Sequence, residues 1–371
     1  MKIWKIVLFA LCMVAIDFGI IGYEDPANSA EDIRIIIGSF DYDKLTHADP
    51  QLSDFLSDEP VPRHYYGAKL EPVTHVLHGA GQSNAQDVEN YRKTLKSYNP
   101  VLFMDYCRVN NAGTWCADSL KKKLRKFPKY TVVQLGLSMT EDGKPEKHYE
   151  HEVAAGKHDT NLTILLNSLK RLDVPLYIRI GYELNGSWNG YQPEEYKKAF
   201  QHVTQMIRKN GINAATVWCP HPSNLKEAMR YYPGDEWVDW WAVDIFSPNQ
   251  ISESKPLIRE AHKHGKPMMI GESTPRHVGV LGGKTSWDKW FDPYFELIHT
   301  SPGIKAFSYI NWDWAKYPQW KNWGDARLQQ NKVVAKLYRK EMSLPLYQHG
   351  STRRAFQASI SATEKSKLPN N

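Results

Sequence analysis

The chain has 371 residues, of which 42% are hydrophobic and 24% are charged, enough apolar material for one large domain or two small ones. Its formal net charge is +6, and the Lys and Arg residues are scattered or interleaved with acidic residues. No basic stripe is combined with stacking aromatics, so the composition argues against a nucleic-acid partner.

The first 22 residues have the pattern of an export signal or a membrane anchor. Lys2 and Lys5 precede an apolar run from Ile6 to Ile16, which is short for a membrane-spanning helix. Because no clear small-x-small cleavage site follows, an uncleaved anchor through residues 6–22 stays open. We therefore expect an exported protein, either secreted, periplasmic or membrane-anchored, in which residues 23–72 form an extension that packs on the main domain.

Three cysteines lie beyond the N-terminal segment, too few for a disulfide framework. In an oxidising compartment Cys107 and Cys116 can form a disulfide within one loop, which would leave Cys219 free. The run from His148 to Glu152 lacks the spacing of metal ligands. The run from His262 to His264 precedes a Gly-Lys-Pro helix stop, where basic residues favour the helix C-terminus. We expect no metal and no cofactor.

From about residue 73, short β-prone runs alternate with amphipathic helical patterns. The strand candidates are Thr74 to His78, Val101 to Tyr106, Tyr130 to Leu137, Pro175 to Tyr182, Ala214 to Cys219, Trp240 to Phe246, Pro267 to Glu272 and Lys305 to Trp312. The clearest helix begins at Pro193 and stops at Asn210-Gly211. Further helices are expected at 87–95, 161–172, 254–264, 287–299 and 327–340.

Eight strands, each followed by a helix, predict an α/β fold of the closed (β/α)8 TIM barrel type over residues 73–343. An open doubly wound sheet is the alternative, although no glycine-rich dinucleotide fingerprint follows any strand. Residues 344–371 lack apolar periodicity and are expected to form a polar C-terminal tail on the surface.

In such a barrel the active site lies at the carboxyl ends of the strands. The residues at or just after the expected strand ends are His78, Asp105, Gln134, Glu183, Trp218, His221, Asp244, Glu272, Trp312, Asp313 and Trp314. The chain also contains 13 Trp and 20 Tyr, many of them near strand ends. Core packing accounts for part of this aromatic content, and the remainder suits stacking against sugar rings.

Glu183 and Glu272 stand out because each ends an apolar run, where an isolated carboxylate would be costly to bury. They follow the fourth and seventh strands, which lie across the barrel from one another. Such a pair can hydrolyse a glycosidic bond, one carboxyl giving a proton and the other attacking or stabilising the anomeric carbon. The structural alternative is that each glutamate caps a helix or pairs with an arginine.

Arg179 lies four residues before Glu183, and strand alternation would give the two side chains the same facing. A buried arginine beneath the nucleophile would keep that carboxylate ionised. Alternatively, Arg179 pairs with a structural carboxylate such as Asp105 or Asp244.

Several stretches in order resemble glycoside hydrolase family 26, from the clan of retaining (β/α)8 glycosidases: "RIGYELNGSWNGY", "ATVWCP", "YYPGDEWVDWWAVDIF", "KPMMIGESTPR", "IKAFSYINWDW" and "WGDAR". The resemblance covers roughly Thr74 to Lys340. It implies that Glu183 is the acid/base and Glu272 the nucleophile. It also implies that Asn185 and Trp188 shape the loop beside the acid, and that Trp312 provides a sugar platform.

Two positions depart from the mannanase pattern of that family. Tyr182 precedes the acid where a His is common, and Phe246 stands near the tip of the sixth strand where a Tyr is common. The substrate-binding candidates are His78, Asp105, Tyr182, Asn185, Trp188, Trp218, His221, Asp244, Phe246, Trp312 and Trp314, with Arg179 in a supporting role.

These observations predict a monomeric retaining glycoside hydrolase that acts on a β-linked polysaccharide or oligosaccharide and resembles endo-β-1,4-mannanases. Because the two departures weaken the expectation of mannan specificity, β-xylanase, β-glucanase and transglycosylase activities stay open. A non-catalytic carbohydrate-binding barrel is the alternative from another class.

Overall fold

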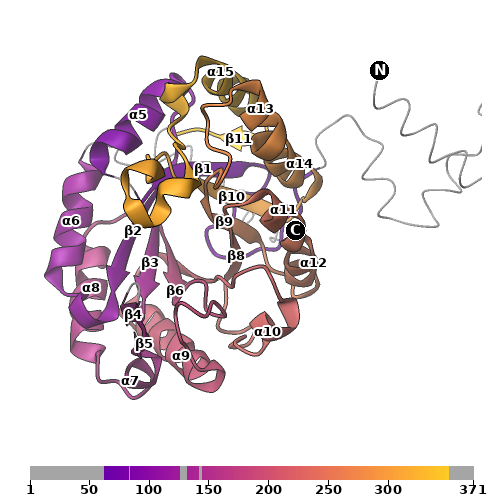
Figure 1. The fold of residues 1–371 in the computed structure, drawn as a ribbon. Coiled ribbons are helices and arrows are strands. Elements are labelled where there is room, and N and C mark those ends of the chain that lie inside the picture. Colours follow the sequence, from indigo (N-terminus) through magenta and orange to yellow (C-terminus); the bar gives the residue numbers. More distant parts are fainter. Residues whose placement is uncertain (1–61, 83, 126–131, 142–143, 351–371) are drawn as a thin grey trace, which may run out of the picture. The chain divides into compact units, whose positions relative to one another are not determined.

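The structure, a computed structural model, describes residues 62–82, 84–125, 132–141 and 144–350 (Figure 1). The described residues form a closed barrel of parallel strands, which confirms the (β/α)8 prediction. In barrel order the strands are β1 (Val76–Gly81), β2 (Leu102–Arg108), β3 (Val132–Ser138), β6 (Leu176–Ile180), β7 (Ala214–Trp218), β8 (Trp240–Ile245), β9 (Met268–Ser273) and β10 (Ile304–Tyr309). Strand β10 pairs with β1 and closes the barrel.

Helices cover the outside of the barrel, as Figure 1 shows. The longer ones are α5 (Ala85–Leu95), α6 (Thr114–Leu124), α8 (Asp159–Lys170), α9 (Pro193–Asn210), α12 (Lys255–Lys263), α14 (Asp292–Thr300) and α15 (Lys332–Met342). The sequence signals for α9 are confirmed, because Pro193 lies in its first turn and Gly211 ends it with a left-handed φ of 66°.

Short helical segments lie in the connections. They are η1 (Val109–Asn111), α7 (Glu150–Ala154), α10 (Leu225–Met229), α11 (Pro248–Glu253), α13 (Lys284–Ser286), η2 (Trp287–Phe291), η3 (Trp314–Lys316), η4 (Pro318–Trp323) and η5 (Leu328–Gln330). A hairpin of β4 (Thr140–Glu141) and β5 (Lys144–His148), which the sequence did not predict, follows β3.

Alternate side chains of each strand enter two different cores. One core, which includes Leu77, Tyr177 and Met269, fills the barrel interior. The other, which includes Ile178 and Ile270, packs between the strands and the helices. A residue at a strand end therefore reaches the mouth of the barrel only if its side chain faces inward.

Residues 62–72 close the end of the barrel opposite the strand tips. The Tyr177 hydroxyl donates to the Leu70 carbonyl, and the Trp240 indole donates to the Lys69 carbonyl. Lys305, at the start of β10, lies buried beside Glu71 at 3.7 Å. These bonds satisfy polar groups that would be costly to bury alone.

The packed part of the chain extends past the expected boundary at residue 343. Strand β11 (Tyr347–Gln348) pairs with β1, and Leu346 and Tyr347 are buried. Residues 344–350 are therefore not a surface tail, because apolar contacts and strand pairing hold them on the barrel. Residues 351–371 lie outside the described residues.

Within the described residues, no helix has the length and apolar character needed to cross a membrane. The expected export signal or anchor at 1–22, and residues 23–61 of the expected extension, lie outside them.

Candidate active site

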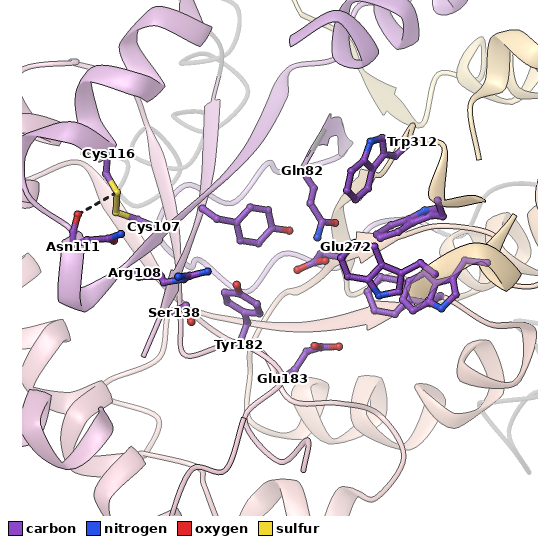
Figure 2. A pocket seen from close by; sticks show the side chains of 15 residues that line it. Gln82, Cys107, Arg108, Asn111, Cys116, Ser138, Tyr182, Glu183, Glu272 and Trp312 are labelled. Atoms are coloured by element: carbon purple, nitrogen blue, oxygen red, sulfur yellow. Dashed lines mark hydrogen bonds between the residues drawn. A yellow bond between two sulfur atoms is a disulfide. The ribbon is translucent and has the colours of Figure 1, made fainter. Parts of the chain in front are cut away.

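The carboxyl ends of the strands surround a cleft of about 590 Å³ (Figure 2). Its lining residues are Gln82, Tyr106, Cys107, Arg108, Asn111, Cys116, Ser138, Tyr182, Glu183, Phe246, Glu272, Trp312, Trp314, Trp320 and Trp323. The two glutamates that the sequence singled out therefore share one cavity, into which strands from both sides of the barrel contribute.

Glu183 is placed by a tight turn rather than by strand alternation, because β6 ends at Ile180. Gly181 and Glu183 both have left-handed φ values, of 56° and 52°. At Gly181 a Cβ would approach the Tyr196 ring to 2.8 Å, so glycine fits both the conformation and the space. A glutamate at positive φ is uncommon, and such strain is concentrated at functional sites.

Side chains and backbone from neighbouring loops hold this turn. The Glu183 amide donates to the Cys219 carbonyl at 2.6 Å, and the Asn189 amide group donates to the carbonyls of Tyr182 and Glu183. The Trp188 indole donates to Glu183 Oε2 at 2.9 Å. The carboxyl group of Glu183 therefore has a fixed direction.

Burial, and then the nearby charge of Glu272, raise the pKa of Glu183 to about 7. The hydrogen bond from Trp188 and the charges of Arg179 and Arg276 act in the opposite direction and only partly offset the rise. A carboxyl group with this pKa is protonated in a large fraction of molecules near neutral pH, which suits a general acid.

Glu272 lies in a different environment, because a buried guanidinium contacts it. Arg179 Nη1 donates to Glu272 Oε1 at 2.9 Å, and Arg179 Nη2 donates to Asp244 Oδ2 at 2.5 Å. Arg179 and Asp244 are fully buried, and Glu272 is 5% exposed. The sequence left open whether Arg179 supports the nucleophile or pairs with a structural carboxylate, and the structure shows that it does both.

Burial alone would lower the pKa of Arg179, but the charges of Asp244 and Glu272 outweigh it and raise that pKa, so the guanidinium stays charged. Burial raises the pKa of Asp244 well above its usual range, and Arg179 offsets this only in part. Arg179 therefore links Asp244 and Glu272 within one buried cluster.

The cysteines bear on this site. Cys107 and Cys116 form a disulfide in the cleft wall, as the sequence suggested for an oxidising compartment. Cys219 is free and buried, and Arg179 Nη2 lies 3.2 Å from its sulfur. The free thiol is thus a third partner of the arginine beneath the glutamates.

Aromatic side chains form one wall of the cleft. Trp312 and Trp314 follow β10, their ring centroids 4.7 Å apart, and the Trp314 indole donates to Thr274 Oγ1. Trp320 and Trp323 of η4 complete the wall, and they were not predicted from the sequence because they lie beyond the strand tip. The stretch "YPQWKNW" has an aromatic residue at every third position, and this pattern could have predicted that the aromatic wall continues here.

The other wall carries Tyr106 and Tyr182, whose rings meet edge to face at 5.6 Å. Arg179 lies beneath Tyr182, with Cζ 4.8 Å from the ring centroid. Tyr106 was missed because Asp105, the polar residue beside it, was chosen as the strand tip. Phe246, at the tip of β8, also lines the cleft and contacts Trp323 at 5.6 Å between centroids.

Asn185 and His221 lie beside the cleft and join two loops. Asn185 donates to the His221 carbonyl and accepts from the His221 amide. The His221 ring meets Trp188 at 5.1 Å between centroids and contacts Gln250 Nε2 through its own Nε2. Trp188 is 44% exposed, so its indole edge holds Glu183 while much of the ring remains accessible.

Seven of the expected substrate-binding residues are not among those that line the cleft. Asn185, Trp188 and His221 lie beside it, and four others lie farther from it or beneath it. His78 is fully buried and contacts His349 through its ring nitrogen, and Asp105 pairs with Lys123 of α6. Trp218 packs against Trp241 in the outer core. These three side chains face away from the barrel axis, because the neighbouring positions on their strands are the inward ones.

The fourth, Asp244, does face inward, but it is fully buried in its contact with Arg179 and does not line the cleft. Its place is under Glu272 rather than against a substrate. In the part of the chain that the structure describes, no group of three or more His, Cys, Asp or Glu side chains is arranged to hold a metal ion.

Comparisons with known proteins agree with this geometry. The family model described as glycosyl hydrolase family 26 matches residues 146–281, which include both glutamates. A β-1,3-xylanase from Vibrio sp is 27% identical over 326 residues, covering 76% of this chain and 68% of that protein. A β-1,3-xylanase from Alcaligenes sp is 28% identical over 325 residues, covering 76% of this chain and 67% of that protein.

Among solved structures, a family 26 β-mannanase from Bacteroides ovatus aligns with a TM-score of 0.56 and 14% identity, covering 74% of this chain and 90% of that one. At an identity this low, the similarity between the two structures shows a shared fold and nothing more. The matched family segment, the xylanase relatives and the shared barrel together support a glycoside hydrolase that is similar to family 26.

Proposed function

We propose that this protein hydrolyses a β-linked polysaccharide with retention of configuration, and that its substrate class is β-1,3-xylan. The main support for this reaction is that the two carboxyl groups of the cleft lie in different electrostatic environments. The pKa of Glu183 is raised to about 7, whereas Glu272 contacts a buried guanidinium. When two carboxyl groups of one site lie in such different environments, the one with the raised pKa suits the acid and the one beside the cation suits the nucleophile.

In the first step Glu183 protonates the departing glycosidic oxygen while Glu272 attacks the anomeric carbon, forming a covalent glycosyl-enzyme. Glu183, now ionised, then takes a proton from water, which attacks the same carbon and releases Glu272. The Trp188 indole donates to Glu183 Oε2 and stabilises the ionised state between the two steps.

Glu272 suits the nucleophile for geometric reasons. Its Oε1 already accepts from Arg179, and it is 5% exposed, so little water competes for it. Glu183 has an indole rather than a cation as its direct partner, which leaves its proton exchangeable. The opposite assignment would require the carboxyl group beside the arginine to hold the proton, against the charge of that arginine.

The choice of β-1,3-xylan rests on the two curated relatives that bear this activity in their names. It is supported by the cleft, where Phe246 brings no hydroxyl group to the tip of β8 and the tryptophans add apolar surface. Fewer polar contacts suit a pentose ring, which has no exocyclic hydroxymethyl group to bind.

The test is a panel of β-1,3-xylan, β-1,4-xylan, β-1,4-mannan and β-1,3-glucan, with Glu272→Ala and Glu183→Gln as controls. We expect release of sugars from β-1,3-xylan at least about tenfold faster than from the others, and loss of activity in both controls. Preference for mannan would overturn the proposed substrate. Binding without hydrolysis of any polysaccharide would overturn the proposed reaction in favour of a carbohydrate-binding barrel.

A further inference from the structure

Strand β9, which carries Glu272, pairs irregularly with both strands beside it. Against β8, Ile270 pairs with Val243, but the next pair is Glu272 with Asp244, so Gly271 has no partner of its own. The irregularity lies one residue before the carboxylate that we assign as nucleophile.

The same extra residue appears against β10 on the other side. There Phe307 pairs with Ile270 and Tyr309 pairs with Ser273, so one residue of β10 faces two of β9 between these pairs. Gly271 therefore forms a β-bulge relative to both neighbours, a feature that redirects side chains beside active sites.

The bulge decides which way Glu272 points. Met269 belongs to the barrel interior and Ile270 to the outer core. Regular alternation would then send Gly271 inward and Glu272 outward. With the extra residue, Glu272 lines the cleft and Ser273 takes the outward position, where the Tyr294 hydroxyl of α14 donates to its Oγ at 3.0 Å.

Glycine at this position is required by space rather than by backbone conformation. A Cβ built on Gly271 would lie 2.7 Å from Asp244 Oδ1 and 2.8 Å from both Cζ and Nε of Arg179. These side chains are fully buried and bonded to each other, so they have little room to yield. The bulge thus packs its backbone directly on the ion pair that supports Glu272.

A buried glutamine holds the bulge from across the barrel. Gln134 of β3 is fully buried, and its Nε2 donates to the Gly271 carbonyl at 2.8 Å. The Ser308 hydroxyl donates to Gln134 Oε1 at 3.1 Å, which fixes the direction of the amide. Strands β3, β9 and β10 are therefore connected through one amide group inside the barrel.

We propose that the Gly271 bulge and Gln134 are positioning elements of the reaction, which turn Glu272 into the cleft and hold it against Arg179. Neither residue carries out the chemistry. The inference rests on the proposed role of Glu272 as nucleophile, and it adds that the direction of this side chain depends on a residue across the barrel.

The direct test is Gln134→Met, which keeps most of the side-chain volume but removes the donor to the Gly271 carbonyl. We expect kcat to fall about tenfold or more while KM changes less than about twofold, because the loss affects alignment and not substrate contact. The rate of covalent labelling by a 2-deoxy-2-fluoro xyloside should fall in the same proportion. Gln348→Met, a change at a buried glutamine on β11, serves as the matched control with wild-type rates.

Gly271→Ala is the second variant, with an expected loss in kcat of about a hundredfold. If this variant fails to fold, the Gln134→Met variant still tests the inference. Wild-type kcat and labelling rate in Gln134→Met would overturn the inference, as would an equal fall in the Gln348→Met control. The proposed function fails separately, if Glu272→Ala retains wild-type activity or the wild type hydrolyses no substrate.

Discussion

Arg179 and Glu272 are joined by a buried ion pair, with 2.9 Å between Nη1 and Oε1. The arginine comes from β6 and the glutamate from β9, so the pair spans the interior of the barrel. The same guanidinium also binds Asp244, the register partner of Glu272 on β8. Arg179 is therefore both a structural link among three strands and the electrostatic support of the proposed nucleophile.

Replacing Arg179 by Met should damage both stability and catalysis. Loss of one partner leaves buried carboxylates uncompensated, which typically costs about 3 to 5 kcal/mol of unfolding free energy. We expect kcat to fall by at least about a hundredfold. Chemical denaturation and steady-state kinetics measure the two effects. Adding Asp244→Asn to this variant should recover part of the stability but not the activity; recovery of activity would contradict the proposed support of Glu272.

The pH profile should report the raised pKa of Glu183. The proposed acid must be protonated in the first step, so kcat/KM should decline as the pH rises above about 7. Trp188→Phe removes an N–H donor that favours the ionised carboxyl group, and the decline should therefore move about half a unit to one unit higher in pH. A shift to lower pH would contradict this account. Trp237→Phe is the control, because Trp237 lies against Arg208.

The same group should make stability depend on pH. A carboxyl group whose folded-state pKa is raised favours the folded state at low pH and loses this contribution as the pH rises through its folded pKa. For Glu183 the window runs from the ordinary carboxyl pKa of 4.5 to the raised pKa of about 7. Glu183→Gln should therefore become more stable relative to the wild type as the pH rises across this window. Denaturation curves at several pH values measure the difference, and a difference that stays constant would contradict the raised pKa.

Trp312 should contribute mainly to binding. Its ring lines the cleft and contacts Trp314 and Tyr317, both at 4.7 Å between centroids. Removing a stacking surface from substrate and transition state alike raises KM more than it lowers kcat. For Trp312→Ala we expect KM to rise about five- to tenfold, a loss of about 1 to 1.4 kcal/mol. An unchanged KM for xylan oligosaccharides would exclude this wall from the binding site.

The Cys107–Cys116 disulfide should stabilise both the fold and the cleft wall. The two cysteines are nine residues apart in sequence, and closing a loop of this size contributes about 3 kcal/mol in the chain-entropy model. A double Cys→Ser variant should unfold at lower denaturant concentration and show a higher KM, because both residues line the cleft. Reductant should reproduce these changes in the wild type and leave the double variant unaffected; insensitivity of the wild type would contradict the prediction.

The sequence predicted the barrel well because strands buried on both faces appear as continuous apolar runs separated by amphipathic helices. It predicted less well which face each strand-end residue occupies. For β1 the expected strand stopped at His78, whereas the real strand continues through Gly79 and Gly81, whose absent side chains make room for the backbone of β2. Beyond Leu77, the inward positions of β1 are therefore glycines, which carry no hydrophobic signal, and His78 faces outward.

The two glutamates were recognised for their types and positions, yet the local geometry that directs them was not visible in the sequence. Glu183 lies in a turn with left-handed φ values, and Glu272 follows a bulge. Both features depend on pairing with neighbouring strands and on contacts across the barrel, such as Gln134 with Gly271. Hydrophobic periodicity records burial along one strand and carries no information about such contacts.

The most direct test of the central claim is to identify the residue that forms the covalent intermediate. The protein would be incubated with a 2-deoxy-2-fluoro xyloside with a good leaving group, digested, and its peptides mapped by mass spectrometry. The account predicts one glycosyl group on Glu272, in the peptide containing "MMIGES". A label on Glu183, or steady hydrolysis with no covalent intermediate and inversion at the anomeric carbon, would contradict it.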